Sequence, residues 1–433
     1  MNIERMTGKK WDLIVVGAGL SGVASAVSAR RQGMEVLLIE KAGYLGGAPA
    51  TCLINPFMPY STKVNGEKLA LSQGFFAELQ GLLREVSCYT GGNNTLAEGA
   101  RREELHEEYV KLALDRLITR EGVQPLFHAF LCGVEKDGET IKAVKVATKC
   151  GVLTFEAKYF IDCTGDGDLA MMAGCPFQLG REEDGLCQPM TLCFRIGNID
   201  IPTLDKNRPL MQKLFKQFQE EGKIKNPREN VLMFYTHVDG MMHFNTTRVI
   251  KLDPTNPFDV TNAEMIAREQ MFELYHFLRD NIPGCEKSQL LYSASEIGVR
   301  ESRMIDGEYV LNQEDLINCV KFDDRIAAGN YDIDIHNPEG TGTSHYYFKD
   351  GTWYTIPYRT LLPKNADNLL VAGRCISSTH EAQASIRIMP IVATLGHAAG
   401  VAVGLANKAG VGVKEIDVKQ LQAQLEAEGA FIG

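Results

Sequence analysis

The sequence predicts an α/β fold in which a mainly parallel sheet carries a small antiparallel meander and an α+β domain is inserted into the chain. Three short apolar runs predict the sheet, because each has the composition of a strand buried on both faces and passes directly into a glycine-containing turn. These runs cover residues 13–16, 159–161 and 368–372. Between the last two runs the pattern changes to long amphipathic helices and mixed strands. We therefore predict a sheet domain of residues 1–174 and 354–433, and an inserted domain of residues 175–353.

The first strand leads into a nucleotide-binding pattern. Gly17, Gly19 and Gly22 follow it as G-x-G-x-x-G. In such a turn the first glycine makes the tight bend, the second lets the backbone approach a pyrophosphate, and the third allows close packing of the following helix. That helix is expected over residues 20–31, with Leu20 and Ser21 at its positive N-terminal end.

A second strand, expected over residues 35–39, ends at Glu40, eighteen residues after Gly22. A carboxylate at this place accepts hydrogen bonds from ribose hydroxyls and argues against a 2′-phosphate. Strand, turn, helix, strand and acid thus occur in the order that a nucleotide site requires. Taken alone, this unit is also compatible with NAD.

The next segments continue the sheet domain. Residues 41–48, with Lys41, Gly46, Gly47 and Ala48, predict a glycine-rich loop laid along a ligand. An amphipathic helix is expected next, then a third strand, and then antiparallel strands joined at two glycine turns. A short helix ending near Gly174 follows the second buried strand. These elements correspond to residues 101–121 for the helix, 123–130 for the third strand, and 137–138 and 149–151 for the turns.

In the inserted domain we expect a strand over residues 241–250 and a helix over residues 261–281. Thr261 and Glu264 have capping-box spacing, which places the start of that helix at Thr261 and has no functional meaning. After the third buried strand come Gly373 and Arg374, and residues 417–428 predict a solvated covering helix.

Composition and charge disfavour several classes of partner. The 433 residues are 45% hydrophobic, which is typical of a globular protein. Their net charge of -10 disfavours nucleic acid or an anionic membrane surface as the main partner. Residues 388–406 lack charge but contain Pro390 and several glycines, so a buried helix is expected there and no membrane span. Asp12 and the glycine turn argue against an export signal near the N-terminus. We predict a cytoplasmic protein.

Cysteine and histidine spacing predicts no metal site. The eleven cysteines are scattered, form no C-x-x-C pair and show no iron–sulfur cluster pattern, so reduced thiols are expected. Cys52 lies near the glycine-rich loop, but no second cysteine lies near it in the sequence to form a redox pair.

Four segments together resemble the bacterial FAD-dependent oxidoreductase family of the glutathione-reductase-like flavoprotein superfamily, which has heterodisulfide-reductase-A-like relatives. They are GAGLSG with Glu40, YLGGAPAT, DCTGDGDLA and NLLVAGRCISSTHEAQASIRIMPIVATLGHAAGVA. EIGVRESRMIDGEYVL and YYFKDGTWYTIPYRTLLP extend the resemblance through the inserted region. It implies a Rossmann-like FAD-binding domain that holds noncovalent FAD, with ADP on the first βαβ unit and the flavin ring at the junction with the inserted domain.

The resemblance also implies which residues bind FAD. The three fingerprint glycines would line the pyrophosphate, Glu40 the adenosine ribose, and Gly46 and Gly47 the middle of the cofactor. The helix beginning near Met389 would place its positive N-terminus near the reduced flavin. The expected cofactor-binding set is Gly17, Gly19, Leu20, Ser21, Gly22, Glu40, Lys41, Gly46, Gly47, Ala48, Phe130 through its backbone near adenine, Thr164, Gly165, Asp166, Gly373, Arg374, Met389 and Ile391.

Two histidines are candidates for proton transfer. His380 follows the flavin-side turn and is the first candidate, and His345, beside two tyrosines, is the second. Arg300, Arg303 and Arg387 are candidates for binding a carboxylate or other polar substrate, with salt bridging between domains as the alternative.

These observations predict an FAD-dependent oxidoreductase that transfers a hydride between a small organic substrate and flavin N5. One alternative is a thiol or disulfide reductase. Another is a flavin-carrying electron-transfer subunit that depends on a redox partner protein. The substrate and the oligomeric state remain open.

Overall fold

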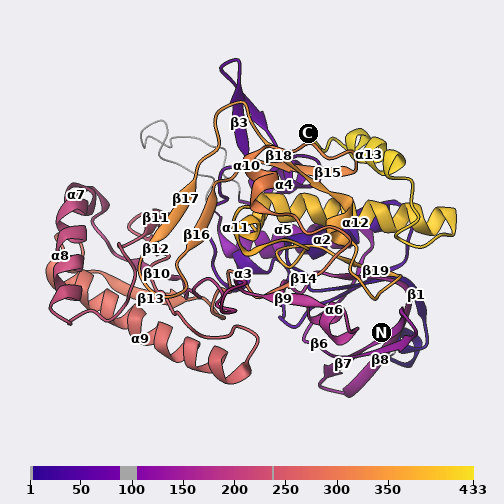
Figure 1. The fold of residues 1–433 in the computed structure, drawn as a ribbon. Helices are drawn as coiled ribbons and strands as arrows, with labels where there is room; N and C mark the ends of the chain where they lie inside the picture. The colour runs from indigo at the N-terminus through magenta and orange to yellow at the C-terminus, as the bar shows by residue number, and fades with distance from the viewer. Residues whose placement is uncertain (1–2, 88–104, 237) are drawn as a thin grey trace.

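The computed structural model describes residues 3–87, 105–236 and 238–433. Among these residues, seven strands form one sheet in the order β5-β2-β1-β8-β7-β6, and β19 also pairs with β8 (Figure 1). The bounds are β1 Lys10–Val16, β2 Val36–Ile39, β5 Gln124–Leu126, β6 Phe130–Asp137, β7 Thr140–Thr148, β8 Gly151–Asp162 and β19 Leu369–Val371. The predicted α/β fold with a parallel sheet and an antiparallel meander is confirmed.

Strand β8 joins the two parts of this sheet. Its first half runs antiparallel to β7, with Gly151 opposite Thr148. Its second half runs parallel to β1 and to β19, with Asp162 beside Val16 on one side and Val371 on the other. The three buried strands predicted from apolar runs are therefore neighbours, and the turns that follow them meet at one edge of the sheet.

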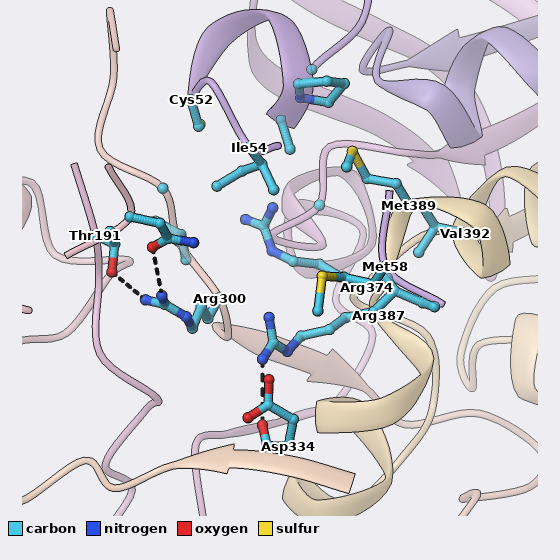
Figure 2. A pocket seen from close by; sticks show the side chains of 18 of the residues that line it. Cys52, Ile54, Met58, Thr191, Arg300, Asp334, Arg374, Arg387, Met389 and Val392 are labelled. Atoms are coloured by element: carbon cyan, nitrogen blue, oxygen red, sulfur yellow. Dashed lines mark hydrogen bonds between the residues drawn. The ribbon is translucent and has the colours of Figure 1, made fainter. Parts of the chain in front are cut away.

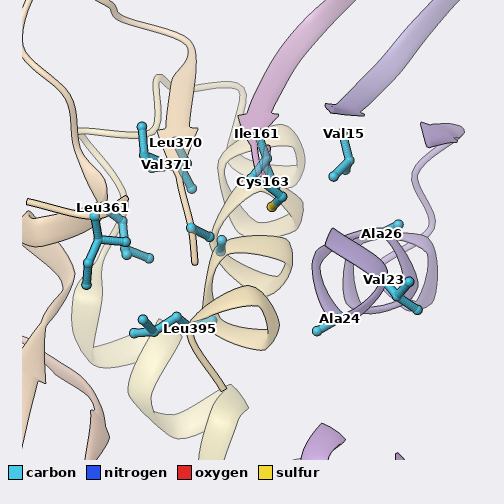
Figure 3. Packing of buried hydrophobic residues seen from close by; sticks show 14 of the residues in the cluster. Val15, Val23, Ala24, Ala26, Ile161, Cys163, Leu361, Leu370, Val371 and Leu395 are labelled. Atoms are coloured by element: carbon cyan, nitrogen blue, oxygen red, sulfur yellow. The ribbon is translucent and has the colours of Figure 1, made fainter. Parts of the chain in front are cut away.

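Two helices packed against each other cover this sheet. They are α2 (Leu20–Arg31) and α12 (Met389–Ala409), seen side by side in Figures 1 and 3. A Cβ added at Gly396 would lie 2.8 Å from Cα of Ser21, and one at Gly400 would collide with the Ser25 carbonyl oxygen, so the two backbones touch. By length and composition α12 could cross a membrane, but 89% of its apolar window is buried inside the protein. It is the tightly packed core helix that its glycines predict.

A separate lobe lies at one side of the molecule (left in Figure 1). There β11-β12-β10-β13 form an antiparallel sheet covered by three helices, and the apolar core of this lobe draws on residues 194–285. The bounds are β10 Phe194–Gly197, β11 Met233–Tyr235, β12 Met242–Phe244, β13 Gln289–Ser293, α7 Ile201–Lys206, α8 Arg208–Glu220 and α9 Pro257–Asn281. The domain boundaries given above stay predictions.

Shorter elements lie outside the two larger sheets. Among the described residues, four two-stranded ladders pair β3 with β4, β9 with β14, β15 with β18 and β16 with β17. Their bounds are β3 Ser61–Val64, β4 Glu67–Ala70, β9 Phe177–Leu179, β14 Arg303–Ile305, β15 Arg325–Gly329, β16 Ile333–His336, β17 Thr343–Tyr346 and β18 Tyr354–Pro357. The remaining helices are α1 Ile3–Thr7, α3 Ala48–Thr51, α4 Phe75–Ser87, α5 Glu107–Glu121, α6 Asp168–Met172, α10 Gln313–Ile317, η1 Tyr358–Leu361, α11 His380–Ile386 and α13 Val418–Ala427.

The predicted start of the long helix α9 is wrong. The helix begins at Pro257, because the Asn256 side chain caps it by accepting hydrogen bonds from the Phe258 and Asp259 amides. Thr261 lies inside the helix and its hydroxyl donates to the Pro257 carbonyl at 2.7 Å. A second capping residue, five positions upstream of Thr261, thus sets the helix start in place of the capping box.

Three other boundaries differ from the prediction. The strand predicted over residues 123–130 is broken by His128, whose φ of 53° turns the chain between β5 and β6. The strand predicted over residues 241–250 ends at Phe244. Farther along the predicted strand, the Arg248 amide and carbonyl form hydrogen bonds with the Gln270 side chain and so do not pair with a neighbouring strand. Helix α5 begins at Glu107, and residues 101–104 of the helix predicted there lie outside the described residues.

Candidate functional site

A cavity of about 1020 Å³ opens where the glycine turns after β1 and β8, the start of α12 and the β16–β17 ladder meet. One end is formed by backbone and small residues of the large sheet. The other end is walled by charged side chains from the lobe and from β16 and β17. The predicted glycine turns therefore open into the same space as several of the predicted charged residues.

The first end of the cavity is a backbone cradle at the start of α2. The N-cap residue Gly19 has no side-chain cap from the described residues, so the amide groups of Leu20 and Ser21 at the helix start remain available to a ligand in the cavity that they line. A Cβ at Gly47 would lie 2.7 Å from Cα of Gly19, and Gly47 has a φ of 60°. Only glycine at position 47 leaves the cradle open without strain.

Glu40 ends β2 beside this cradle. Its carboxylate accepts hydrogen bonds from the Ala18 amide at 2.7 Å and the Ala42 amide at 2.8 Å, and it is 9% exposed on the cavity wall. Each carboxylate oxygen has a further lone pair, so this fixed acid can still accept from ligand hydroxyls. The observed position fits the ribose contact expected for Glu40.

The middle of the cavity is bounded by the turn after β8 and the turn after β19. Arg374 donates to Asp166 at 2.5 Å, and the Ser302 hydroxyl donates to the same carboxylate oxygen at 2.6 Å. Burial raises the pKa of Asp166, but the Arg374 charge and these hydrogen bonds outweigh it, so the pKa lies below the ordinary value. A Cβ at Gly165 would lie 2.8 Å from the Arg374 guanidinium, which keeps that position small.

A second uncapped helix start faces the same cavity. The N-cap of α12 is Ile388, which has no side-chain cap from the described residues, and Met389 and Val392 line the cavity with it (Figure 2). Ile391 instead turns into the core beside Gly329. Negative charge on a ligand is stabilised near such a helix N-terminus.

His345 lies on the charged wall. Its Nδ1 is 2.6 Å from Oδ2 of Asp332, its Nε2 is 3.7 Å from Oδ1 of Asp334, and its ring stacks on Tyr347. Strand β16 places Asp334 and His336 on one face, since side chains two residues apart on a strand point the same way. Burial lowers the pKa of His336 to about 3, so this imidazole is neutral at pH 7.

Besides Ile391, four predicted residues lie away from the cavity wall. His380, the first candidate for proton transfer, is buried at the start of α11, where its Nδ1 is 2.7 Å from Glu301. Arg303 pairs with Asp168 at 2.9 Å. Phe130 begins β6 with its side chain 58% exposed. Gly22 also lies off the wall, where a Cβ would collide with the Gly17 carbonyl, and this fits its expected role in helix packing.

The predicted residues that do line the cavity are the following: Gly17, Gly19, Leu20, Ser21, Glu40, Lys41, Gly46, Gly47, Ala48, Thr164, Gly165, Asp166, Gly373, Arg374, Met389, Arg300, Arg387 and His345. Sequence reasoning missed Arg228, Asp332, Asp334 and His336 on the same wall. The alternation in YDIDIH is a signal for a polar strand face, whereas Arg228 carries none.

The described cysteines on the cavity wall are poor nucleophiles. Cys52 is half-buried, and desolvation of its thiol raises the pKa to about 12. Cys163 contacts the Ser21 and Ser25 hydroxyls beneath α2, and burial raises its pKa to about 12 as well. Both are therefore protonated at neutral pH.

Comparisons with known proteins agree with this geometry. A family model described as "FAD dependent oxidoreductase" matches residues 12–425. Among curated proteins, 45 residues are 42% identical to 3-oxosteroid 1-dehydrogenase of Mycolicibacterium smegmatis, over 10% of this chain and 8% of that one. Another 58-residue match is 40% identical to dihydrolipoamide dehydrogenase of Chaetomium thermophilum, over 13% of this chain and 11% of that one. The matches thus span about a tenth of each curated relative.

Alignments with solved structures cover most of the chain at low identity. A flavoprotein/dehydrogenase from Cytophaga hutchinsonii has a TM-score of 0.47 and 13% identity, over 96% of this chain and 82% of that one. A geranylgeranyl bacteriochlorophyll reductase-like protein from Thermoplasma acidophilum has a TM-score of 0.45 and 13% identity, over 97% of this chain and 84% of that one.

Proposed function

Because this chain belongs to the FAD-dependent oxidoreductase family, with FAD as its cofactor, we propose that it binds FAD noncovalently along the cavity and oxidises or reduces a small organic substrate. The observation that carries this proposal is the continuity of the cavity. It extends from the backbone cradle at α2, past the N-terminus of α12, to a wall of arginine, histidine and aspartate side chains.

The residues present fit an extended cofactor of the glutathione-reductase type. The start of α2 would hold the pyrophosphate, Glu40 the adenosine ribose, and Gly46 and Gly47 would let the backbone approach the middle of the cofactor. The N-terminus of α12 would lie toward the flavin ring and stabilise negative charge there. When bound, FAD supplies a hydride acceptor or donor at flavin N5.

We propose that His345 is the residue that accepts and donates the substrate proton. Histidine is the side chain most often used for proton transfer, and the Asp332 carboxylate at Nδ1 favours the tautomer whose Nε2 can accept a proton. Oxidation of a substrate alcohol or amine carbon releases a hydride and, from the adjacent oxygen or nitrogen, a proton. His345 Nε2 would take that proton in oxidation and return it in reduction.

Thiol chemistry is less well supported by the cavity. The Cys52 thiol is protonated at neutral pH, and the Cys163 thiol contacts the Ser21 and Ser25 hydroxyls beneath α2. A disulfide reductase needs an attacking thiolate. We therefore favour a substrate that is oxidised or reduced at a carbon atom over a thiol or disulfide.

The test uses the purified holoprotein. Its visible spectrum should show bound flavin, and anaerobic mixing with a panel of hydroxy acids, amines, sugars and thiols should bleach that spectrum with one class of carbon substrate. Lack of flavin absorption after adding FAD would overturn the cofactor assignment. Bleaching by thiols alone, with block by a cysteine reagent, would favour a disulfide reductase instead.

A further inference from the structure

Three arginines on the cavity wall have no hydrogen-bonded carboxylate among the described residues. Arg300 is held by neutral acceptors, the Pro189 carbonyl, the Thr191 hydroxyl and the Asn245 side-chain oxygen. Arg387 reaches only the Gln188 side-chain oxygen at 3.4 Å and the Asp334 carbonyl at 3.5 Å. Arg228 is 3.9 Å from Glu229, which is too long for a hydrogen bond.

Parts of these guanidinium groups are buried without any partner. Nε and one terminal nitrogen of Arg228 and Nε of Arg387 make no hydrogen bond with the described residues. Arg228 is only 4% exposed, although it lines the cavity. A buried, uncompensated guanidinium is costly unless a ligand supplies the missing acceptors.

The groups are close enough to affect one another. The pKa of Arg300 falls to about 9, chiefly through burial and then through the positive charges of Arg228, Arg387 and Arg248. Figure 2 shows the Arg300 guanidinium turned toward Thr191, with Arg387 to its right and Asp334 below Arg387. An anion between the two guanidinium groups would relieve this repulsion.

The neighbouring carboxylates already have partners. Glu229 lies 3.1 Å from Arg248. Asp332 holds His345, and Asp334 accepts from Tyr331 at 3.1 Å. Arg248 itself does not line the cavity, and the imidazole of His336 on this wall is neutral.

We propose that Arg228, Arg300 and Arg387 form a binding site for a single carboxylate group, which anchors the substrate beside His345. Guanidinium groups bind a planar carboxylate through paired hydrogen bonds. A singly charged carboxylate is repelled less by Asp332 and Asp334 on the same wall than a dianionic phosphate would be. The substrate role rests on the proposed function, but the anion site itself can be tested without any redox reaction.

The test measures binding of unreactive probes to the holoprotein by calorimetry and by the change in the flavin spectrum. The probes are acetate and benzoate, their neutral amides acetamide and benzamide, and inorganic phosphate and sulfate. We expect the carboxylates to bind at least tenfold more tightly than their amides and than phosphate or sulfate. Equal binding of acid and amide would overturn the proposal, and tighter phosphate binding would replace the carboxylate by another anion.

Two substitutions locate the site. Arg300→Gln and Arg387→Gln should each weaken benzoate binding about 10- to 100-fold, since a hydrogen bond to a charged group contributes about 1.5–3 kcal/mol. Arg359→Gln is the matched control, because Arg359 pairs with Asp324 on the surface and is absent from the cavity wall. Unchanged benzoate binding in both cavity variants would refute the site.

The outcomes also separate this proposal from the proposed function. Carboxylate binding that depends on Arg300 and Arg387, without flavin reduction by any panel compound, would support the anion site and count against the redox assignment. Flavin reduction by neutral compounds with no carboxylate binding would do the opposite. The comparison of acids with amides needs only the unaltered protein, so it stands even where a variant fails to fold.

Discussion

Nδ1 of His345 lies 2.6 Å from Oδ2 of Asp332 at the edge of the cavity, whereas His380 is buried against Glu301 away from it. From sequence position, His380 is the first candidate for proton transfer and His345 the second; the structure favours the opposite order. The contrast also gives a direct way to distinguish a proton-transfer residue from a structural one.

Replacing His345 with Asn should slow flavin reduction by the true substrate about 10²- to 10⁴-fold, because general acid–base catalysis typically contributes that much. The pH profile should lose the limb that reports this base. Stopped-flow reduction across pH measures both effects. His276→Asn is the control, since His276 sits on α9 next to Asp280 and outside the cavity wall. Loss of the same limb in His380→Asn, with His345→Asn unaffected, would return the role to His380.

Gly47→Ala should weaken FAD binding about tenfold or more, equivalent to ~1.4 kcal/mol. The added methyl would press on Cα of Gly19 and narrow the cradle. Gly138→Ala has nearly the same φ of 61° but open space around the new Cβ, so it should carry the backbone strain without the loss of affinity. Fluorescence titration of the apoproteins with FAD compares the two. Equal affinities would show that the cradle tolerates a side chain.

Gly396→Ala should destabilise the protein by about 1–3 kcal/mol, the usual cost of overpacking, because the new methyl would meet the backbone of Ser21. Gly81→Ala, in α4, meets no atom within 4 Å and should stabilise by about 0.5–1 kcal/mol through its helix propensity. Urea denaturation of both variants measures the change in free energy of unfolding. Similar changes of the same sign would contradict close contact between α2 and α12.

Lowering the pH should destabilise the folded protein through His336. Its folded-state pKa of about 3 lies below the unfolded value of about 6.5, so the unfolded chain takes up a proton that the folded chain refuses as pH falls below 6.5. Between pH 7.5 and pH 5 this should cost the native state about 2 kcal/mol. His336→Gln removes that term while retaining an acceptor for Arg248. The difference in unfolding free energy between wild type and variant should therefore shift by that amount, and a constant difference would contradict a buried neutral imidazole.

The backbone part of the site could be predicted from sequence because its causes are local. Gly17, Gly19 and Glu40 lie within one strand–helix–strand unit, so their spacing alone sets their geometry. The positions of the buried strands could be predicted for the same reason, because a turn follows each apolar run directly in the sequence.

The charged wall could be predicted only in part, because it depends on pairing between distant segments. The charge of Arg300 interacts with those of Arg228 and Arg387, which lie more than seventy and more than eighty residues away in the sequence, and no local pattern predicts this approach. His345 reaches the cavity because β17 pairs with β16, which places it opposite Asp334. His380 follows the turn in sequence, but α11 directs it toward Glu301.

The contact between Ser21 and Gly396 has a consequence for the life of the protein in the cell. Ser21 lines the cofactor cavity, and its backbone contacts α12, the helix whose N-terminus faces the same cavity. FAD that binds only the folded chain at 100 times its dissociation constant stabilises that chain by about 2.7 kcal/mol. The abundance of this protein should therefore follow the flavin supply, with chains made during riboflavin shortage removed by proteolysis sooner than loaded ones.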